Sequence, residues 1–167
     1  MKKASVLFVC TGNICRSPTA EGVFRALAKR RGVLDRLRVD SAGTHDYHAG
    51  EAPDPRSIQH ASRRGDDLKP LRARQVGSRD FADFGWILAM DRGHRRLLGA
   101  IAPPETDARI ELFLEHSARW PGLDVPDPYY GGAKGFETVL DMVEEASERL
   151  LDAVLAGIGD KPAAGRT

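Results

Sequence analysis

Short apolar runs alternate with helical stretches along this chain, and this alternation is the feature that most constrains its fold. The apolar runs of strand length lie at 6–9, 37–42, 86–89 and 109–112. Apolar residues with helical spacing mark the segments 19–31, 54–64, 90–98 and 136–155. Strands that are joined through helices pair in parallel by right-handed crossovers. We therefore predict an α/β fold, a small open four-stranded parallel sheet with helices on both faces.

The chain has the length of one domain. It contains 167 residues, and a chain of this size buries about 70% of the surface that its unfolded form exposes. No internal repeat or linker divides it, so residues 1–157 are predicted to form a single domain and 158–167 a frayed tail. No apolar stretch approaches the roughly 18 residues of a membrane span, and the apolar run near the N-terminus lacks a signal-peptide cleavage site. We expect a cytoplasmic protein that does not bind a membrane.

The net charge of +1 hides a difference between the two halves of the chain. Residues 1–80 carry 16 Lys and Arg against 9 Asp and Glu, an excess of +7, whereas residues 81–167 carry 9 against 15, an excess of −6. The basic residues form no continuous run, and no nucleic-acid-binding motif accompanies them. We therefore expect no nucleic-acid partner, because a positive face that attracts an anionic substrate explains the excess as well.

The segment after the first predicted strand has the composition of a phosphate-binding loop. It reads Cys-Thr-Gly-Asn-Ile-Cys-Arg-Ser-Pro over residues 10–18 and leads into a helix. A tight loop at a helix N-terminus directs several backbone N–H groups into one concavity, where the helix dipole adds positive potential. Gly12 lets the backbone approach a ligand, Asn13 tolerates left-handed geometry, and Arg16 can grip two oxygens of a tetrahedral anion. The loop would hold a phosphate directly above the thiol of Cys10.

A thiol in this position is suited to covalent catalysis. The positive potential of the loop stabilises a thiolate, and Ser17 is placed to donate a hydrogen bond to the sulfur. A thiolate that faces a phosphoryl group is a nucleophile, which assigns that role to Cys10. The second cysteine, Cys15, is too close in sequence for a disulfide framework, and no further Cys or His pair completes a zinc site. No metal and no cofactor are expected.

These residues resemble a known family. Residues 9–21 are similar to the signature of the low-molecular-weight protein tyrosine phosphatases, Val-Cys-x-Gly-Asn-Ile-Cys-Arg-Ser-Pro-x-Ala-Glu. The resemblance continues at 40–43, 89–91 and 127–130 and so spans nearly the whole chain. It implies a phosphotyrosine phosphatase that works through a phosphocysteine intermediate. In that enzyme Cys10 is the nucleophile, Arg16 holds the phosphate, and Asp127 is the general acid and base.

The place of Asp127 in the sequence fits this role. It lies in the loop after the last predicted strand, at the sheet edge where the phosphate-binding loop opens. A leaving phenolate needs a proton, and the same carboxylate can then take one from the water that hydrolyses phosphocysteine. Asp-Pro is also a common turn former, so the assignment depends on the presence of the cysteine loop.

Further residues are expected to line or support the phosphotyrosine pocket. They are Thr11, Gly12, Asn13, Ile14, Cys15, Ser17, Tyr47, His48, Tyr129 and Tyr130. Of these, Asn13 and Ser17 are expected to support the loop. Tyr47 and His48 are expected to form one wall, and the tyrosines at 129 and 130 the other, where an aromatic ring can stack on the substrate. Alternatively, these two tyrosines anchor their loop on the domain.

Other side chains have less specific interpretations. Cys15 is either a small buried hydrophobe or, as the resemblance implies, the partner of Cys10 in a reversible disulfide that makes the enzyme redox-sensitive. Asp91 is expected to be a structural or helix-capping carboxylate near the site. The pair His45 and His48 has no third metal ligand near it in the sequence. The isolated histidines are expected at the surface: His60, His94 and His116.

Three alternative functions remain open. A protein arginine phosphatase of the same family would have a small polar residue where this chain has Ile14, and an apolar group there favours an aryl substrate. A thioredoxin-coupled arsenate reductase needs cysteines beyond Cys15, and a non-catalytic phosphate-binding module needs neither a nucleophile nor an acid. The expected partners are a tyrosine-phosphorylated protein as substrate and inorganic phosphate as product. The enzyme is expected to be a monomer or to self-associate weakly.

Overall fold

Four parallel strands form the centre of the computed structural model, which describes residues 4–129 and 131–158. The strands are β1 (Ala4–Cys10), β2 (Leu37–Gly43), β3 (Trp86–Ala89) and β4 (Arg109–Leu112). Their order across the sheet is β2-β1-β3-β4. The sheet confirms the predicted α/β class, and its two central strands, β1 and β3, are those whose side chains are the most completely buried.

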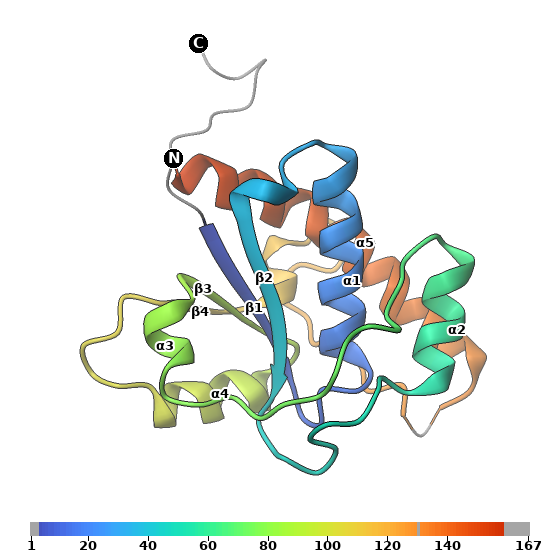
Figure 1. The fold of residues 1–167 in the computed structure, drawn as a ribbon, viewed down its shortest axis with the longest axis horizontal. Helices are drawn as coiled ribbons and strands as arrows, with labels where there is room; N and C mark the ends of the chain where they lie inside the picture. Colours follow the sequence, from blue (N-terminus) through green and yellow to red (C-terminus); the bar gives the residue numbers. More distant parts are fainter. Residues whose placement is uncertain (1–3, 130, 159–167) are drawn as a thin grey trace.

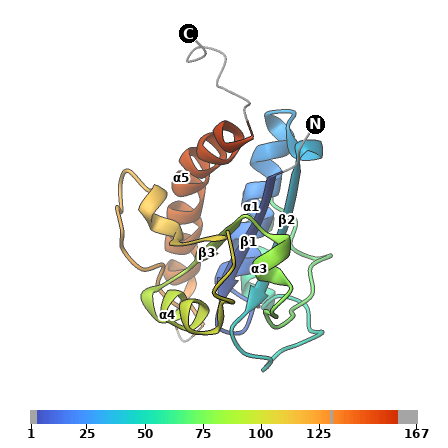
Figure 2. The ribbon, with the colours of Figure 1, turned by 90° about the vertical axis from the view of Figure 1, so that its left-hand side faces the viewer.

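Helices cover both faces of this sheet, as predicted. They are α1 (Arg16–Arg30), α2 (Pro55–Arg63), α3 (Asp80–Asp83), α4 (Arg92–Ile101) and α5 (Ala133–Gly157), with 3-10 turns η1 (Leu34–Arg36) and η2 (Phe113–His116). Figure 1 shows α1 and α5 on one face, and Figure 2 looks from the opposite face, which carries α3 and α4. The helix α2 packs outside, against α5 and α1. Within the described residues, no helix has both the length and the apolar composition that a membrane crossing requires.

Side chains of β1 alternate between two apolar cores, one on each face of the sheet. Val6 and Phe8 belong to the core under α1 and α5, where Phe8 packs edge-to-face on Phe24 and Phe113 with ring centroids 5.5 and 5.3 Å apart. The intervening residues of β1 belong to the core under α3 and α4. Because both faces are covered, the strand is apolar throughout and shows no alternation in its sequence.

The helix α1 begins three residues before its predicted start at residue 19. Its first turn, Arg16 to Pro18, is the second half of the cysteine loop and therefore carries polar residues without helical periodicity. Thr19 closes that turn, since both its backbone N–H and its hydroxyl donate to the carbonyl of Cys15. Tyr130 and residues 159–167, which hold almost all of the predicted tail, lie outside the described residues. The short helix α3 and both 3-10 turns have no periodic signal in the sequence and were not predicted.

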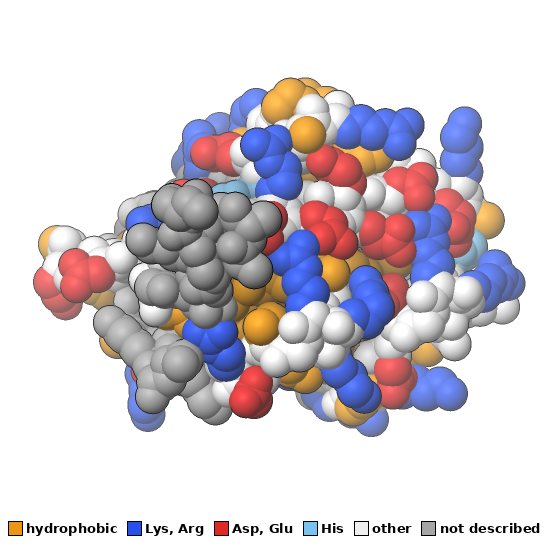
Figure 3. Space-filling view, turned by 90° about the horizontal axis from the view of Figure 1, so that it is seen from above, with side chains coloured by type: hydrophobic (Ala, Val, Ile, Leu, Met, Phe, Trp, Pro, Cys, Tyr) orange, Lys and Arg blue, Asp and Glu red, His pale blue; other side chains and the backbone are white. Residues whose placement is uncertain are grey.

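The basic and acidic halves of the chain pair with each other within the fold. Arg31, just after α1, donates to Glu148 and to Asp152 of α5, the latter at 2.7 Å. Arg64, just after α2, donates to Glu137 of α5 at 2.6 Å. Figure 3, which looks onto the end of the molecule that lies uppermost in Figure 1, shows basic and acidic side chains interspersed. At these positions the basic excess of the first half neutralises α5 and is not a surface for an anionic ligand.

Candidate active site

The cysteine loop lies at the edge of the sheet where the strands end. Cys10 is the last residue of β1 and pairs with Gly43, the last residue of β2. The backbone N–H groups after β2 hold the loop, because Thr44 donates to the carbonyl of Cys10 at 2.8 Å and His45 to that of Thr11 at 3.1 Å. A Cβ on Gly43 would lie 2.6 Å from the Thr11 carbonyl oxygen, so only glycine permits this approach.

Asn13 supports the loop from behind. Its backbone is left-handed, with φ of 58°, and its side chain is 2% exposed. The amide nitrogen donates to the hydroxyls of Ser17 at 2.8 Å and Ser41 at 3.0 Å, and the amide oxygen accepts from the backbone N–H of Arg74 at 3.0 Å. Ser41 in turn donates to the buried carboxylate of Glu21 at 2.7 Å. Asn13 and Ser17 are therefore loop supports, as expected, and neither lines the pocket.

Ser17 connects this support to the sulfur of Cys10. Its hydroxyl oxygen lies 2.9 Å from the Sγ atom of Cys10, and both side chains are buried. Asn13 donates to the Ser17 oxygen, and the single hydroxyl proton of Ser17 has two acceptors within reach, the sulfur at 2.9 Å and the carbonyl of Ala42 at 3.4 Å. The Ser17 hydroxyl therefore lies at hydrogen-bond distance from the sulfur of the predicted nucleophile.

Three polar groups orient the side chain of Arg16, which is 5% exposed. Its Nη1 donates to Asp91 Oδ2 at 2.9 Å and to the carbonyl of Val125 at 3.0 Å, while Nη2 lies 3.7 Å from Asp127 Oδ2. Asp91 is the N-cap of α4, as predicted, because it accepts from the backbone N–H of His94. Burial acts to raise the pKa of Asp91, but the His94 N–H and the Arg16 guanidinium outweigh it and hold that pKa below its usual range.

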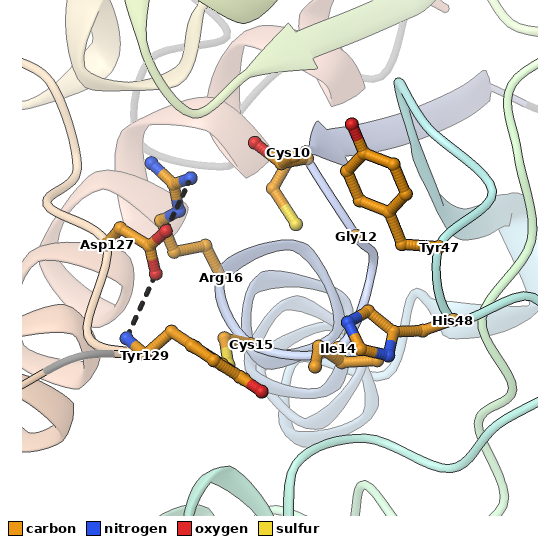
Figure 4. Close-up of a pocket in the computed structure, with 10 residues that line it drawn as sticks. Cys10, Gly12, Ile14, Cys15, Arg16, Tyr47, His48, Asp127 and Tyr129 are labelled. Atoms are coloured by element: carbon orange, nitrogen blue, oxygen red, sulfur yellow. Dashed lines mark hydrogen bonds and ion pairs between the residues drawn. The ribbon is translucent and has the colours of Figure 1, made fainter.

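The predicted site residues surround a cavity of about 290 Å³. It is lined by Cys10, Thr11, Gly12, Ile14, Cys15, Arg16, Tyr47, His48, Asp127 and Tyr129. Figure 4 shows Asp127 and Tyr129 on one side, Tyr47 and His48 on the other, and the sulfur of Cys10 between them. The two walls thus come from the loops after β2 and before α5, far apart in sequence. Tyr130 is the one predicted wall residue whose place is outside the described residues.

The start of α2 joins the cysteine loop to the wall that contains Tyr129. The backbone N–H of Asp54 donates to the carbonyl of Ile14 at 2.8 Å. Arg56 donates to Asp54 Oδ2 at 2.9 Å and to the carbonyl of Tyr129 at 3.0 Å, and its guanidinium lies 5.5 Å from the centre of the Tyr129 ring. These hydrogen bonds from Arg56 hold the pKa of Asp54 below its usual range. Sequence reasoning missed Arg56, because no motif or spacing links it to the site.

Two histidines that were expected at the surface are buried, which corrects the sequence interpretation. His60 is 6% exposed and stacks on Phe136, and His94 is 4% exposed with Nε2 2.8 Å from the hydroxyl of Thr11. Burial, followed by the positive charge of Arg16, lowers the pKa of His94 to about 4. His94 was missed because Thr11, the residue whose hydroxyl it contacts, lies 83 positions away in the sequence. Its place three residues after the predicted helix cap, Asp91, was the one local indication that it lies near the site.

Cys15, which lines the cavity, belongs to a small apolar cluster with Ile14, Ala73 and Phe136. Both Cys10 and Cys15 are free thiols in this structure. Burial raises the pKa of Cys15 to about 12, with the nearby carboxylate of Asp54 adding to the effect, so this thiol stays protonated at neutral pH. Across residues 4–129 and 131–158, no cluster of three His, Cys, Asp or Glu side chains is arranged to hold a metal ion.

Comparisons with known proteins place this geometry in a family. The family model described as low molecular weight phosphotyrosine protein phosphatase matches residues 5–158. A low molecular weight protein-tyrosine-phosphatase of Streptomyces coelicolor is 47% identical over 152 residues, which cover 89% of this chain and 92% of the relative. The crystal structure of YfkJ from Bacillus subtilis superposes with a TM-score of 0.87 at 36% identity, covering 94% and 98% of the two chains. A Drosophila arginine phosphatase superposes with a TM-score of 0.83 at 33% identity, covering 92% and 97%.

Proposed function

Because the chain belongs to the family of low molecular weight phosphotyrosine protein phosphatases, we propose that it hydrolyses phosphotyrosine in proteins through a phosphocysteine intermediate. One observation carries the proposal. A thiol, a guanidinium and a carboxylate, from Cys10, Arg16 and Asp127, line the same cavity, although Asp127 lies far in sequence from the loop that carries the other two. Together they supply the nucleophile, the anion clamp and the proton donor that a phosphate ester requires.

In the first step the thiolate of Cys10 attacks phosphorus, and the bond from phosphorus to the phenolic oxygen breaks. The protonated carboxyl of Asp127 gives its proton to that oxygen, so tyrosine leaves as a neutral phenol. The loop N–H groups and Arg16 bind the phosphoryl oxygens on which charge accumulates. Arg16 suits this role because Asp91 and Val125 occupy Nη1 and leave Nη2 directed toward the cavity side that holds Asp127.

In the second step water attacks the phosphorus of phosphocysteine, and the bond from sulfur to phosphorus breaks. The carboxylate of Asp127 takes one proton from this water, which restores its acid form and releases inorganic phosphate. The electron pair of the broken bond stays on the sulfur of Cys10, which lies 2.9 Å from the Ser17 hydroxyl. The carboxylate is 45% exposed, so water can reach it from the solvent side.

The walls of the cavity favour an aromatic phosphate ester. Tyr47 and Tyr129 present rings on its opposite sides, and Ile14 adds an apolar side chain between them. An aryl ring can stack on such surfaces, whereas the short polar chain of phosphoserine leaves them uncovered. Ile14 likewise favours a phenyl ring over the polar guanidinium of phosphoarginine, which makes protein arginine phosphatase the second candidate.

We further propose that residues 1–157 form the catalytic unit, and that it acts as a monomer in the cytoplasm. The extent of the catalytic unit is supported by the cavity, because every residue that lines it lies within 10–129. The nucleophile must stay a free thiol, and the cytoplasm is the compartment in which thiols are kept reduced. Light scattering of the purified protein tests the monomer, and fractionation of its native cells tests the location.

Steady-state hydrolysis of three matched peptides tests the function. They carry phosphotyrosine, phosphoserine or phosphoarginine at the same position and are assayed in EDTA. We expect turnover of phosphotyrosine alone, complete loss in Cys10→Ser, and a loss of about 10²- to 10⁴-fold in kcat for Asp127→Asn. Asp124→Asn is the matched control, since it removes a nearby exposed carboxylate that pairs with Arg92 instead of facing the cavity.

Other outcomes of this assay would redirect the proposal. Preferred turnover of phosphoarginine would retain the mechanism and reassign the substrate. Binding of phosphate without turnover of any peptide would leave a non-catalytic module. Turnover in Cys10→Ser would refute the phosphocysteine intermediate.

A further inference from the structure

His94 occupies a position between the phosphate-binding loop and the carboxylate that orients Arg16. The ring is 4% exposed, and its Nε2 lies 2.8 Å from the hydroxyl of Thr11, the first residue after the nucleophile. Its Nδ1 lies 3.2 Å from Asp91 Oδ1 and has no hydrogen-bond partner within the described part of the chain. No other buried ring of the described residues bridges two parts of the site in this way.

The surroundings of the ring determine where its proton lies. The imidazole is neutral at pH 7, because burial and the charge of Arg16 lower its pKa to about 4. The negative charge on Asp91 Oδ1, 3.2 Å from Nδ1, attracts a proton at that nitrogen and repels a lone pair, so the proton belongs on Nδ1. The lone pair on Nε2 then accepts the hydroxyl proton of Thr11. A positively charged ring would compete with Arg16 for the carboxylate of Asp91. A neutral ring does not, so Oδ2 of Asp91 stays paired with Arg16.

We propose that His94 is a positioning residue for the phosphate-binding loop, which acts by accepting the hydroxyl proton of Thr11 through Nε2. Thr11 is then held at two points, its carbonyl by the His45 N–H and its side chain by His94. The loop is thereby fixed to α4, the helix whose N-cap, Asp91, aims Arg16. Loop N–H groups and guanidinium are kept in one geometry around the anion. The inference rests on the proposed function only in assuming that the loop binds phosphate.

Three substitutions at His94 separate the two nitrogens. His94→Gln places an amide near the position of Nε2 and can keep the link to Thr11. His94→Asn places an amide near the position of Nδ1, where it meets Asp91 but does not reach Thr11. His94→Ala removes both contacts. One net hydrogen bond corresponds to about a 10-fold change in binding. We expect Ala and Asn to weaken binding of inorganic phosphate and to lower kcat/KM about 10-fold, and Gln to stay within about 2-fold of wild type.

A double substitution tests whether His94 acts through Thr11. Thr11→Val removes the hydroxyl while keeping the shape of the side chain. In that background we expect His94→Ala to cost less than about 2-fold in phosphate affinity, because the contact is already gone. The same loss as in the wild-type background, or rescue by Asn and not by Gln, would overturn the proposal. If His94→Ala does not fold, the single variant Thr11→Val tests the same hydrogen bond from its other end and should show the same loss of phosphate affinity. This variant is expected to fold, because Thr11 lines the pocket and is not buried in the core.

Calorimetry with inorganic phosphate keeps this test independent of turnover. If the protein binds phosphate but hydrolyses no phosphotyrosine, the proposed function fails while the affinities still test His94. The nitrogen chemical shifts of the His94 ring provide a second readout. We expect a protonated Nδ1 and an unprotonated Nε2 at pH 7, and the opposite tautomer would contradict the hydrogen bond from Thr11.

Discussion

Replacing Asn13 by alanine and by glycine separates two contributions of this residue to the phosphate-binding loop. One contribution comes from the three hydrogen bonds of its side chain, to Ser17, Ser41 and the backbone of Arg74. The other comes from its backbone, whose φ of 58° is left-handed. Both substitutions remove the hydrogen bonds, but only alanine also places a Cβ in a conformation that disfavours it.

The expected losses follow from these contacts. Each buried hydrogen bond contributes about 1 kcal/mol to the free energy of unfolding, so losing three costs about 3 kcal/mol. A left-handed alanine adds about 1 kcal/mol that glycine avoids. We therefore expect Asn13→Gly to destabilise the protein by about 3 kcal/mol and Asn13→Ala by about 4 kcal/mol. Both should also lower kcat, because Ser17 loses the hydrogen bond from Asn13 that holds its hydroxyl beside Cys10.

Unfolding in urea, monitored by far-UV circular dichroism, measures these free energies. The midpoints of the variants and the wild type are compared with one common m-value. Asn13→Asp is the matched control, since it tolerates the left-handed backbone and keeps an acceptor for the Arg74 N–H but cannot donate to Ser17 and Ser41. Its loss should lie between wild type and glycine. Losses below 1 kcal/mol, or glycine less stable than alanine, would refute the assignment of Asn13 as the support of the loop.

Three further predictions concern residues around the site and on the far side of α1. Arg56→Ala should raise KM for a phosphotyrosine peptide about 5-fold with little change in kcat, because the wall at Tyr129 loses its hydrogen bond to α2 while the reacting groups stay in place. Iodoacetamide at pH 8 should alkylate Cys10 well before Cys15, whose raised pKa of about 12 keeps it a thiol. Burial raises the pKa of Asp66 to about 6 from 3.8, so its protonated form is favoured by folding, and this stability is present below pH 4 and lost as the pH rises through 6. After allowance for screening by solvent, Asp66→Asn should stabilise the protein at pH 7.5 by about 1 kcal/mol.

Each of these predictions has a matched control. Arg56→Lys keeps the positive charge but cannot donate to Asp54 and to the Tyr129 carbonyl at the same time, so its KM should resemble that of Arg56→Ala. A wild-type KM in Arg56→Lys would contradict the role of the guanidinium. Mass spectrometry of the alkylated peptides identifies the modified cysteine, and early modification at 15 would contradict its burial. Asp67→Asn changes the exposed neighbour of Asp66 and should leave stability unaltered. If Asp66→Asn and Asp67→Asn changed the free energy of unfolding equally, burial of Asp66 could not be the cause.

The sheet and the nucleophile could be predicted from the sequence because their signals are local. A strand buried on both faces is a continuous apolar run, as at Val6 to Val9, and the loop that follows carries its glycine, asparagine and arginine within a few residues. The family resemblance then assigned Asp127, and the structure brings that residue to the same cavity. These inferences required no knowledge of long-range packing.

The contacts that hold the site together could not be predicted in this way, because their partners are distant in sequence. His94 reaches Thr11 across 83 positions, and Arg56 reaches Tyr129 across 73. A lone histidine or arginine has no periodicity or motif that reveals such a partner. The part of the basic excess that pairs with α5 could not be predicted for the same reason, since pairs such as Arg31 with Asp152 form only when α1 and α5 pack together.

Trapping of the covalent intermediate tests the central claim most directly. p-Nitrophenyl phosphate has a leaving group that needs little protonation, so Asp127→Ala should still form phosphocysteine but hydrolyse it slowly. Acid quenching within the first turnover, followed by mass spectrometry, should find a stoichiometric phosphate on the peptide that contains Cys10, and none in Cys10→Ser. Phosphate on another residue, or turnover with no phosphorylated enzyme at any time, would contradict the account.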